Sequence, residues 1–264
     1  MTQLSDIGCY IVDMDGTIYL GEQVIPGARE LLAHFDAAGT PYYFFTNNSS
    51  KSPVDYVEKL ARLGFGDYDE SRIITSAHVS MQYIRRTYGE NAAIYAVGTP
   101  SLLSQLNEAG FDVSDSRTPD CLLVGFDTTY DFKKATRAVE LLRAGVPFLA
   151  TNVDAVCPLD GGRVLPDCAS ICAMLTYATG RRPKFLGKPF PETADYIVEY
   201  TGIPAEKIAI IGDRLYTDMR GAVDNGMVAI GVLSGEMTRA DIEASDIRLH
   251  FLFDSVKELL DALR

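Results

Sequence analysis

The sequence contains no tryptophan, only three histidines and an odd number of cysteines. His34, His78 and His250 lie far apart on helix or strand patterns, which argues against a histidine-based metal site. The five cysteines have no regular spacing, so we expect reduced and mostly buried thiols rather than disulfides. Cys168 and Cys172 are four residues apart, but no second pair or neighbouring histidine completes a zinc site.

Long apolar runs and positive charge are scarce as well. No run reaches the roughly 20 apolar residues of a membrane span, and the first residues lack the pattern of a signal peptide, so we expect a cytoplasmic protein. The 36 acidic against 24 basic residues give a net charge of −12, which argues against nucleic acid or an anionic membrane as a partner. A phosphate site here must rely on local positive groups: a metal ion, a lysine or helix N-termini.

The 264 residues are enough for one large or two moderate domains, and two successive series of alternating strand and helix patterns run along them. The second series begins at Ala93 and predicts a parallel sheet of its own. Because the chemistry of the first series resumes only after it, the second series behaves as an insertion. We predict an α/β protein: a doubly wound, parallel-sheet, Rossmann-like core of residues 1–84 and 186–264, with a smaller α/β domain inserted at 85–185. Asp254 is expected to cap a terminal helix.

The first group of chemically informative residues follows a short, mostly apolar strand pattern at residues 7–12. Asp13 and Asp15 come directly after it, at the edge of a parallel sheet where ligands bind, and Gly16 lets the backbone turn. Two residues apart on an extended chain, the carboxylates face the same way. Unit charges about 4 Å apart repel by roughly 4 kcal/mol at an effective dielectric constant near 20. A hard divalent cation such as Mg²⁺ would offset that repulsion.

The next strand pattern, at residues 41–45, ends in Thr46, Asn47 and Asn48, just before a helix that starts near Pro53. These residues offer a hydroxyl group and backbone N–H groups to an anion. Ordinary turn and capping chemistry is the alternative interpretation.

Two later segments add opposite charges. Lys188 lies between a glycine and a proline that hold the backbone extended; taken alone it would be a surface lysine. The most apolar strand pattern, residues 207–212, ends in Asp213, and Asp218 follows five residues later, where a helix N-cap is the alternative role.

Taken in order, these four segments resemble the four motifs of the haloacid-dehalogenase-like hydrolase superfamily, beginning with Asp13-Met14-Asp15-Gly16-Thr17. The resemblance implies that Asp13 is a nucleophile that forms an aspartyl-phosphate. It implies that Asp15 is the general acid and base, and that its backbone carbonyl binds Mg²⁺. An acid at this second position suits a phosphatase and argues against dehalogenation.

The same resemblance assigns the remaining motif residues. Thr46, with Asn47 and Asn48, would bind the phosphoryl group, and Lys188 would neutralise its oxygens and orient the nucleophile. Asp213 would be a direct Mg²⁺ ligand, and Asp218 would hold the water shell of the metal or Lys188.

The insertion between the second and third motifs resembles the branch with a large α/β cap, which includes NagD-like and nitrophenylphosphatase-like enzymes. Within it, residues 149–154 resemble a Thr-Asn-x-Asp segment that faces the active site in that branch. Asn152 and Asp154 are therefore expected to help select the leaving group, although a plain strand-end turn fits equally well. Around residues 166–170 the sequence lacks the glycine-rich turn of the branch. The resemblance therefore does not indicate which substrate this protein uses.

The sequence thus predicts a Mg²⁺-dependent phosphatase that hydrolyses small-molecule phosphate monoesters through an aspartyl-phosphate. Phosphoglycolate or pyridoxal phosphate as the specific substrate, a phosphomutase, and a non-hydrolytic phospho-aspartate signalling module remain alternatives. The acid two residues after the nucleophile and the inserted domain oppose the signalling module. A homodimer formed through the cap is a further hypothesis.

Overall fold

The computed structural model describes residues 3–159 and 162–264, which form two compact units. Unit 1 runs through Thr46 and also contains Pro53–Ile74 and Lys188–Arg264, whereas unit 2 consists of Asn47–Ser52 and Thr75–Gly187. Unit 2 begins at Thr75 rather than at residue 85 because the helix that follows contributes apolar side chains to its core. The short segment Asn47–Ser52 also belongs to unit 2, which the sequence patterns did not indicate.

Unit 1 is built on a six-stranded sheet whose central strands carry aromatic and β-branched residues. Its order is β14 (Phe251–Phe253), β13 (Val228–Val232), β12 (Ile208–Gly212), β1 (Cys9–Val12), β4 (Tyr42–Thr46) and β5 (Ile73–Thr75). Adjacent strands from β14 to β4 pair in parallel, and Val12 is opposite both Ile211 and Phe44. The carboxyl ends of β12, β1 and β4 therefore lie together at one edge.

Helices pack on both faces of this sheet. On one face, Tyr10 and Val12 contact a core formed with α1 (Ala28–Ala38), α2 (Pro53–Arg62) and α10 (Val256–Leu263). On the other face, Ile210 lines a small cavity together with Ile197 of α7 (Pro191–Thr201) and residues around α8 (Arg220–Asp224). The prediction of a doubly wound parallel sheet is confirmed.

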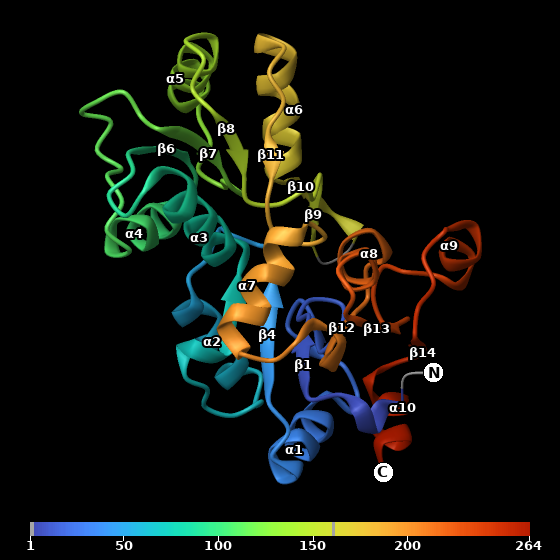
Figure 1. Cartoon of the computed structure of the whole chain (residues 1–264). Coiled ribbons are helices and arrows are strands. Elements are labelled where there is room, and N and C mark those ends of the chain that lie inside the picture. The colour runs from blue at the N-terminus through green and yellow to red at the C-terminus, as the bar shows by residue number, and fades with distance from the viewer. Residues whose placement is uncertain (1–2, 160–161) are drawn as a thin grey trace. The chain divides into compact units, whose positions relative to one another are not determined.

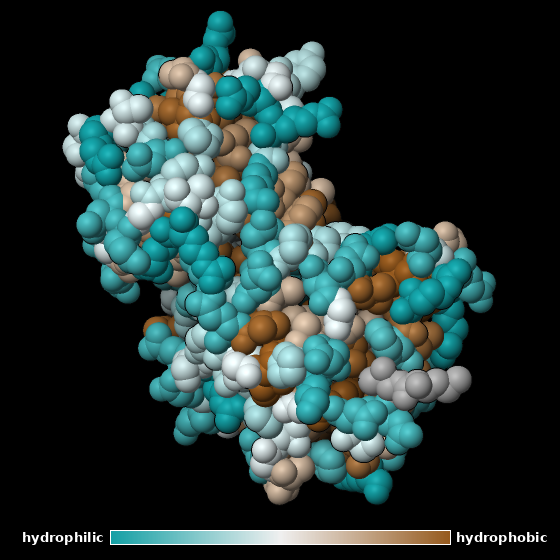
Figure 2. Space-filling view, viewed as in Figure 1, coloured by the Kyte–Doolittle hydropathy of each residue, from teal (hydrophilic) through white to brown (hydrophobic). Residues whose placement is uncertain are grey.

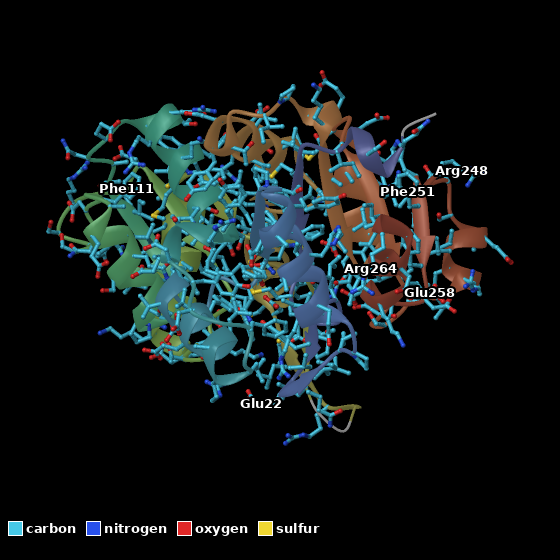
Figure 3. The ribbon with its side chains drawn as sticks, turned by 90° about the horizontal axis from the view of Figure 1, so that it is seen from below. Glu22, Phe111, Arg248, Phe251, Glu258 and Arg264 are labelled. Atoms are coloured by element: carbon cyan, nitrogen blue, oxygen red, sulfur yellow. The ribbon has the colours of Figure 1, made fainter. Side chains whose placement is uncertain are left out.

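Smaller elements complete unit 1: the hairpin of β2 (Tyr19–Leu20) and β3 (Gln23–Val24), and α9 (Arg239–Ala244). Glu22, which is labelled in Figure 3, lies at the turn of the hairpin and forms an exposed ion pair of 3.0 Å with Arg62. Ser255, and not Asp254 as expected, caps α10: its hydroxyl accepts a hydrogen bond from the backbone N–H of Lys257. Asp254 pairs instead with Arg239 on α9.

Unit 2 has its own four-stranded parallel sheet, as the alternating pattern predicted. The strands lie in the order β11 (Lys184–Phe185), β8 (Phe148–Ala150), β7 (Cys121–Val124) and β6 (Ile94–Val97) (Figure 1). One face packs against α5 (Phe132–Arg143) and α6 (Cys168–Thr179), the other against α3 (Ser76–Tyr88) and α4 (Pro100–Glu108). The antiparallel pair β9 (Val156–Pro158) and β10 (Val164–Pro166), like α7 in unit 1, was not predicted.

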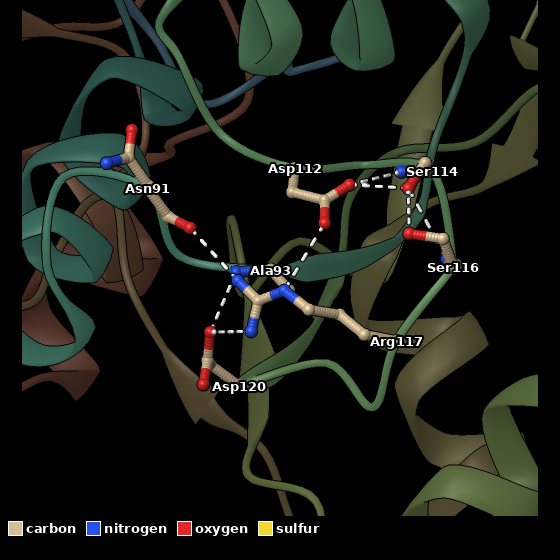
Figure 4. A network of polar contacts seen from close by, with 7 residues as sticks. All are labelled: Asn91, Ala93, Asp112, Ser114, Ser116, Arg117 and Asp120. Carbon is tan, nitrogen blue, oxygen red and sulfur yellow. Dashed lines mark hydrogen bonds and ion pairs between the residues drawn. The ribbon is translucent and has the colours of Figure 1, made fainter.

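A polar network at the start of the unit 2 sheet fixes the loop between α4 and β7 (Figure 4). The guanidinium group of Arg117 bonds to Asp112, Asp120 and the backbone oxygen of Asn91 at 3.1–3.5 Å. Asp120 also accepts a 2.8 Å hydrogen bond from the backbone N–H of Ala93. These contacts join the loop to the residues just before β6.

Hydrophilic residues cover most of the face shown in Figure 2, as expected for a chain in which 23% of the residues are charged. Within residues 3–159 and 162–264, no helix has both the length and the apolar character needed to cross a bilayer.

Candidate active site

Asp13 is held at the end of β1 by the strand beside it. Its backbone N–H donates to the oxygen of Ile211 at 2.8 Å, and the chain then turns tightly around the carbonyl of Met14. Gly16 adopts a φ of +90°, and a Cβ at that position would collide with the carboxylate of Asp213. The turn leaves Asp15 exposed, while Asp13 is largely buried.

A cluster of three carboxylates lies at this edge of unit 1. Asp13, Asp213 and Asp218 each offer an oxygen, and these oxygens all lie within 4.8 Å of one another. Asp213 is 2% exposed and Asp218 is fully buried. The carboxylate of Asp15 is outside this cluster, and the role implied for Asp15 at a metal uses its backbone carbonyl instead.

Lys188 supplies positive charge to the cluster. Its Nζ lies 2.6 Å from an oxygen of Asp13 and 2.6 Å from an oxygen of Asp218, and it donates to the backbone oxygen of Phe45 at 3.3 Å. The side chain is 3% exposed, so solvent screens these interactions little. One ammonium group does not balance three ionised carboxylates, and the remaining hard oxygen donors suit Mg²⁺.

Burial and mutual repulsion shift the pKa values of these groups. Burial raises the pKa of Asp13 well above its usual value; Lys188 opposes the shift, and Asp218 and Asp213 add to it. Burial, followed by the charge of Asp218, raises the pKa of Asp213 to about 6. Burial lowers the pKa of Lys188, but Asp13 and Asp218 more than offset this, and the net shift is upward. Perturbed pKa values of this kind are frequent at functional sites.

The loop after β13 completes the surroundings of Asp213, and the sequence reasoning did not assign it to the site. The backbone N–H of Glu236 donates to Asp213 at 2.8 Å, and the Thr17 hydroxyl donates to its other oxygen at 3.2 Å. Ser234 donates to the backbone oxygen of Gly16 at 2.8 Å. The sequence position of this loop could have assigned it to the site, because residues 233–236 follow another strand that ends at the same edge of the sheet.

Thr46 ends β4 and directly follows Phe45, whose carbonyl oxygen accepts a hydrogen bond from Lys188. Asn47 already belongs to unit 2, where its amide donates to Asp154 at 2.9 Å. The Oδ1 of Asn48 accepts hydrogen bonds from the backbone and hydroxyl of Ser50, which is the turn chemistry considered for this segment.

Asn152 and Asp154, the two candidates in the insertion, are buried in unit 2. The amide nitrogen of Asn152 donates to Asp154 at 3.0 Å and to Asp167 at 3.2 Å. They therefore form a polar network with each other and with Asn47.

A parallel sheet whose strands end in a buried carboxylate–lysine cluster, in a chain interrupted by a second α/β unit, is the arrangement expected of a phosphotransfer protein with an inserted domain. The family comparison agrees. Residues 10–112 match the model of the haloacid dehalogenase-like hydrolases, and residues 185–259 match the related HAD-hydrolase-like model. The chain belongs to this family, as its motifs predicted.

Similar solved structures include a nitrophenylphosphatase, NagD and a glycerol phosphate phosphatase. A 4-nitrophenylphosphatase from Thermotoga maritima is 37% identical, with a TM-score of 0.93 over 99% of both chains. NagD from E. coli is 31% identical, with a TM-score of 0.87 over 96% of this chain and 98% of its own. A glycerol phosphate phosphatase from Mycobacterium tuberculosis, solved with magnesium, is 28% identical, with a TM-score of 0.88 over 96% of this chain and 76% of its own.

Among curated proteins, an acid sugar phosphatase from Staphylococcus aureus is 30% identical over 254 residues, covering 96% of this chain and 97% of that protein. Together these relatives identify the chain as a phosphoric monoester hydrolase, as predicted.

Proposed function

We propose that this phosphatase is Mg²⁺-dependent and hydrolyses small-molecule phosphate monoesters through an aspartyl-phosphate on Asp13. The observation that carries the proposal is the buried cluster of Asp13, Asp213 and Asp218 around the ammonium group of Lys188. Each of these residues occupies the motif position that the family resemblance assigns to that chemistry.

In the first step, an oxygen of Asp13 attacks phosphorus, and the P–O bond to the leaving alcohol breaks. Asp15, exposed beside the nucleophile, gives its proton to the leaving oxygen. In the second step, Asp15 takes a proton from a water molecule, the water oxygen attacks phosphorus, and the P–O bond to Asp13 breaks, which releases inorganic phosphate. Asp13 and Asp15 return to their starting states, so the cycle balances.

The carboxylates of Asp13, Asp213 and Asp218, with the backbone carbonyl of Asp15, are the groups proposed to hold Mg²⁺. Three hard oxygen donors lie within 4.8 Å of one another, and one ammonium group beside them leaves negative charge unbalanced. A divalent cation would offset that charge. When bound, the ion supplies positive charge that stabilises the phosphoryl oxygens in the transition state. The magnesium complex of the mycobacterial relative supports this assignment.

Lys188 orients Asp13 and neutralises developing charge, because its Nζ lies 2.6 Å from the nucleophile. Thr46, Asn47 and Asn48 are proposed to bind the phosphoryl group. The position of Thr46, immediately after the carbonyl that accepts a hydrogen bond from Lys188, supports this role for Thr46. Selection of the leaving group by Asn152 and Asp154 stays a prediction.

The substrate class that we propose is a small phosphate ester of a sugar, polyol or nucleotide, with nitrophenyl phosphate as an artificial substrate. The names of the relatives, which include acid sugar, glycerol phosphate and nitrophenyl phosphatases, support this range. Phosphoglycolate and pyridoxal phosphate are the specific alternatives. We also propose a cytoplasmic location, from composition alone.

A panel of phosphate esters tests the proposal. The wild-type protein should release phosphate from nitrophenyl phosphate and from at least one sugar or polyol phosphate with Mg²⁺, and EDTA should abolish the release. Acid quenching during turnover should trap phosphate on Asp13, identified by peptide mass. Undiminished hydrolysis in EDTA would refute the metal requirement, and turnover without a labelled peptide would refute the covalent intermediate.

A homodimer through unit 2 is a further part of the proposal. Phe132 at the start of α5 is 86% exposed and Tyr177 on α6 is 96% exposed, so two neighbouring helices display large aromatic side chains. Light scattering of the protein in solution decides between a mass near 28.9 kDa and twice that value.

A further inference from the structure

Four peptide bonds connect the two units, and two of them lie directly beside residues of the proposed site. One joins Thr46 of unit 1 to Asn47 of unit 2, and another joins Gly187 of unit 2 to Lys188 of unit 1. Because a peptide group is planar and stiff, fixing one residue of such a pair restricts the backbone of the other. The placement of Asn47 and Gly187 within unit 2 therefore affects Thr46 and Lys188.

Three segments that are distant in sequence meet inside unit 2 at these connections. The hydroxyl of Ser76 donates to the backbone oxygen of Asn47 at 2.6 Å. Gly187 has a φ of +71°, and a Cβ there would lie 2.9 Å from the Oδ1 of Asn47 and 3.2 Å from the Cβ of Ser76. Asn47, Ser76 and Gly187 thus form one close-packed group, which we call the junction cluster.

Asp154 holds the junction cluster from the side of β8. Its Oδ2 accepts hydrogen bonds from the amide of Asn47 at 2.9 Å and from the amide of Asn152 at 3.0 Å. The backbone oxygen of Thr151 would lie 2.5 Å from a Cβ on Gly187, so the same loop leaves no room for a side chain there. Asp154 is 2% exposed, and its loss would leave buried amide donors without this acceptor.

The segment after Asn47 is held just as firmly within unit 2. The Ser49 hydroxyl lies 2.9 Å from the Thr151 hydroxyl and accepts a 3.0 Å hydrogen bond from the backbone N–H of Phe126. Thr99 donates to the backbone oxygen of Ser50 at 2.8 Å. These partners follow β6, β7 and β8, so the segment occupies the carboxyl edge of the sheet, where α/β domains usually bind ligands.

We propose that Asp154 is a positioning residue of the phosphatase. Through the amide of Asn47, and through the contact of Asn47 with Gly187, it fixes the backbone on which Thr46 and Lys188 depend. It acts on the chemical step without touching the substrate, in contrast to the leaving-group role implied by the family resemblance. This inference rests on the proposed roles of Thr46 and Lys188.

The test compares Asp154→Ala and Asp154→Asn with a matched control, Asp167→Ala. Asp167 is also buried and also accepts a hydrogen bond from Asn152, and it accepts another from the backbone N–H of Cys168 at the start of α6. Values of kcat and KM are measured for nitrophenyl phosphate and glycerol phosphate, and melting temperatures are recorded for all variants.

Asp154→Ala should lower kcat on the order of 10- to 100-fold by the same factor for both substrates, with KM within about 2-fold of wild type, because misplaced reacting groups slow the chemical step. Asp154→Asn should recover most of kcat, since an amide oxygen can accept both hydrogen bonds. Asp167→Ala should have a lower melting temperature than the wild-type protein but the same kcat. A rise in KM that depends on the leaving group, or an equal fall of kcat in Asp167→Ala, would overturn the inference.

If Asp154→Ala does not fold, the inference is tested by exchanging the amide of residue 47 and the carboxylate of residue 154. Asn47→Asp places two carboxylates face to face and should lower kcat, and adding Asp154→Asn restores one amide and one carboxylate and should raise kcat again. Failure of the second substitution to raise kcat would refute the inference. The proposed function is judged separately, by the labelled Asp13 peptide in the wild-type protein.

Discussion

In unit 1, buried carboxylates at the strand ends face a lysine, whereas in unit 2 the buried carboxylates of Asp154 and Asp167 share the neutral amide of Asn152. The first arrangement holds several like charges close together and shifts the pKa of Asp13 and its neighbours. The second satisfies its acceptors with amide and backbone N–H groups. An acid at a strand end therefore indicates chemistry only when its partners are known.

The largest expected difference between the two clusters is in activity. Asp13→Asn should abolish turnover, a loss on the order of 10⁴-fold or more, because the amide cannot act as the nucleophile. The variant should remain folded, since a neutral group replaces one whose burial already disfavours charge. Steady-state phosphate release and circular dichroism provide the two measurements.

Asp167→Asn makes the same chemical change at a buried carboxylate of unit 2 and should keep activity within about 2-fold. A wild-type rate of phosphate release in Asp13→Asn, or an equal loss of rate in Asp13→Asn and Asp167→Asn, would show that the two clusters do not differ in function.

A smaller effect is expected on stability, with opposite pH dependence in the two units. In metal-free protein, Asp213 keeps its proton up to about pH 6, so its contribution to stability is full below its usual pKa of 3.8 and is lost as the pH rises through 6. Burial lowers the pKa of His78 to about 4, from 6.5. The unfolded chain therefore protonates His78 first, and stability falls as the pH drops below 6.5.

Thermal melting in EDTA at about pH 7.5 and about pH 5 separates the two effects. Asp213→Asn should gain stability relative to wild type at the higher pH, and His78→Gln at the lower pH, each by roughly 1–2 kcal/mol. His78 accepts a 3.1 Å hydrogen bond from the backbone N–H of Thr75, which a glutamine oxygen can also accept. A gain for Asp213→Asn that is larger at about pH 5 than at about pH 7.5, or a gain for His78→Gln that is larger at the higher pH, would contradict this account.

The smallest effect is expected for Arg117→Ala in the network of Figure 4. The side chain of Arg117 is 50% exposed, so its ion pairs with Asp112 and Asp120 are screened by solvent. The free energy of unfolding should fall by less than about 1 kcal/mol, with activity unchanged. Urea titration measures the change, and a loss of several kcal/mol would show that this surface network stabilises unit 2 as strongly as buried contacts do.

The sequence predicted the fold class and the position of each carboxylate in the cluster, because buried strands have a recognisable composition and Asp13 and Asp213 follow them directly. Helix α7 also had a readable signal, with Pro191 at its first position and Gly202 after its end. No sequence signal indicated that Asn47 belongs to unit 2, because this depends on contacts with Ser76 and Asp154, which are far away in the chain.

The segment Asn47–Ser52 has a practical consequence for exchanging unit 2 between relatives. Residues 75–187 look like a self-contained piece when the sequence is read from end to end, yet six residues from upstream cover the carboxyl edge of their sheet. A chimera that transplants only residues 75–187 would combine them with a foreign segment in place of Asn47–Ser52. Swapping both pieces together keeps the native contacts at this sheet edge and makes unit 2 transferable.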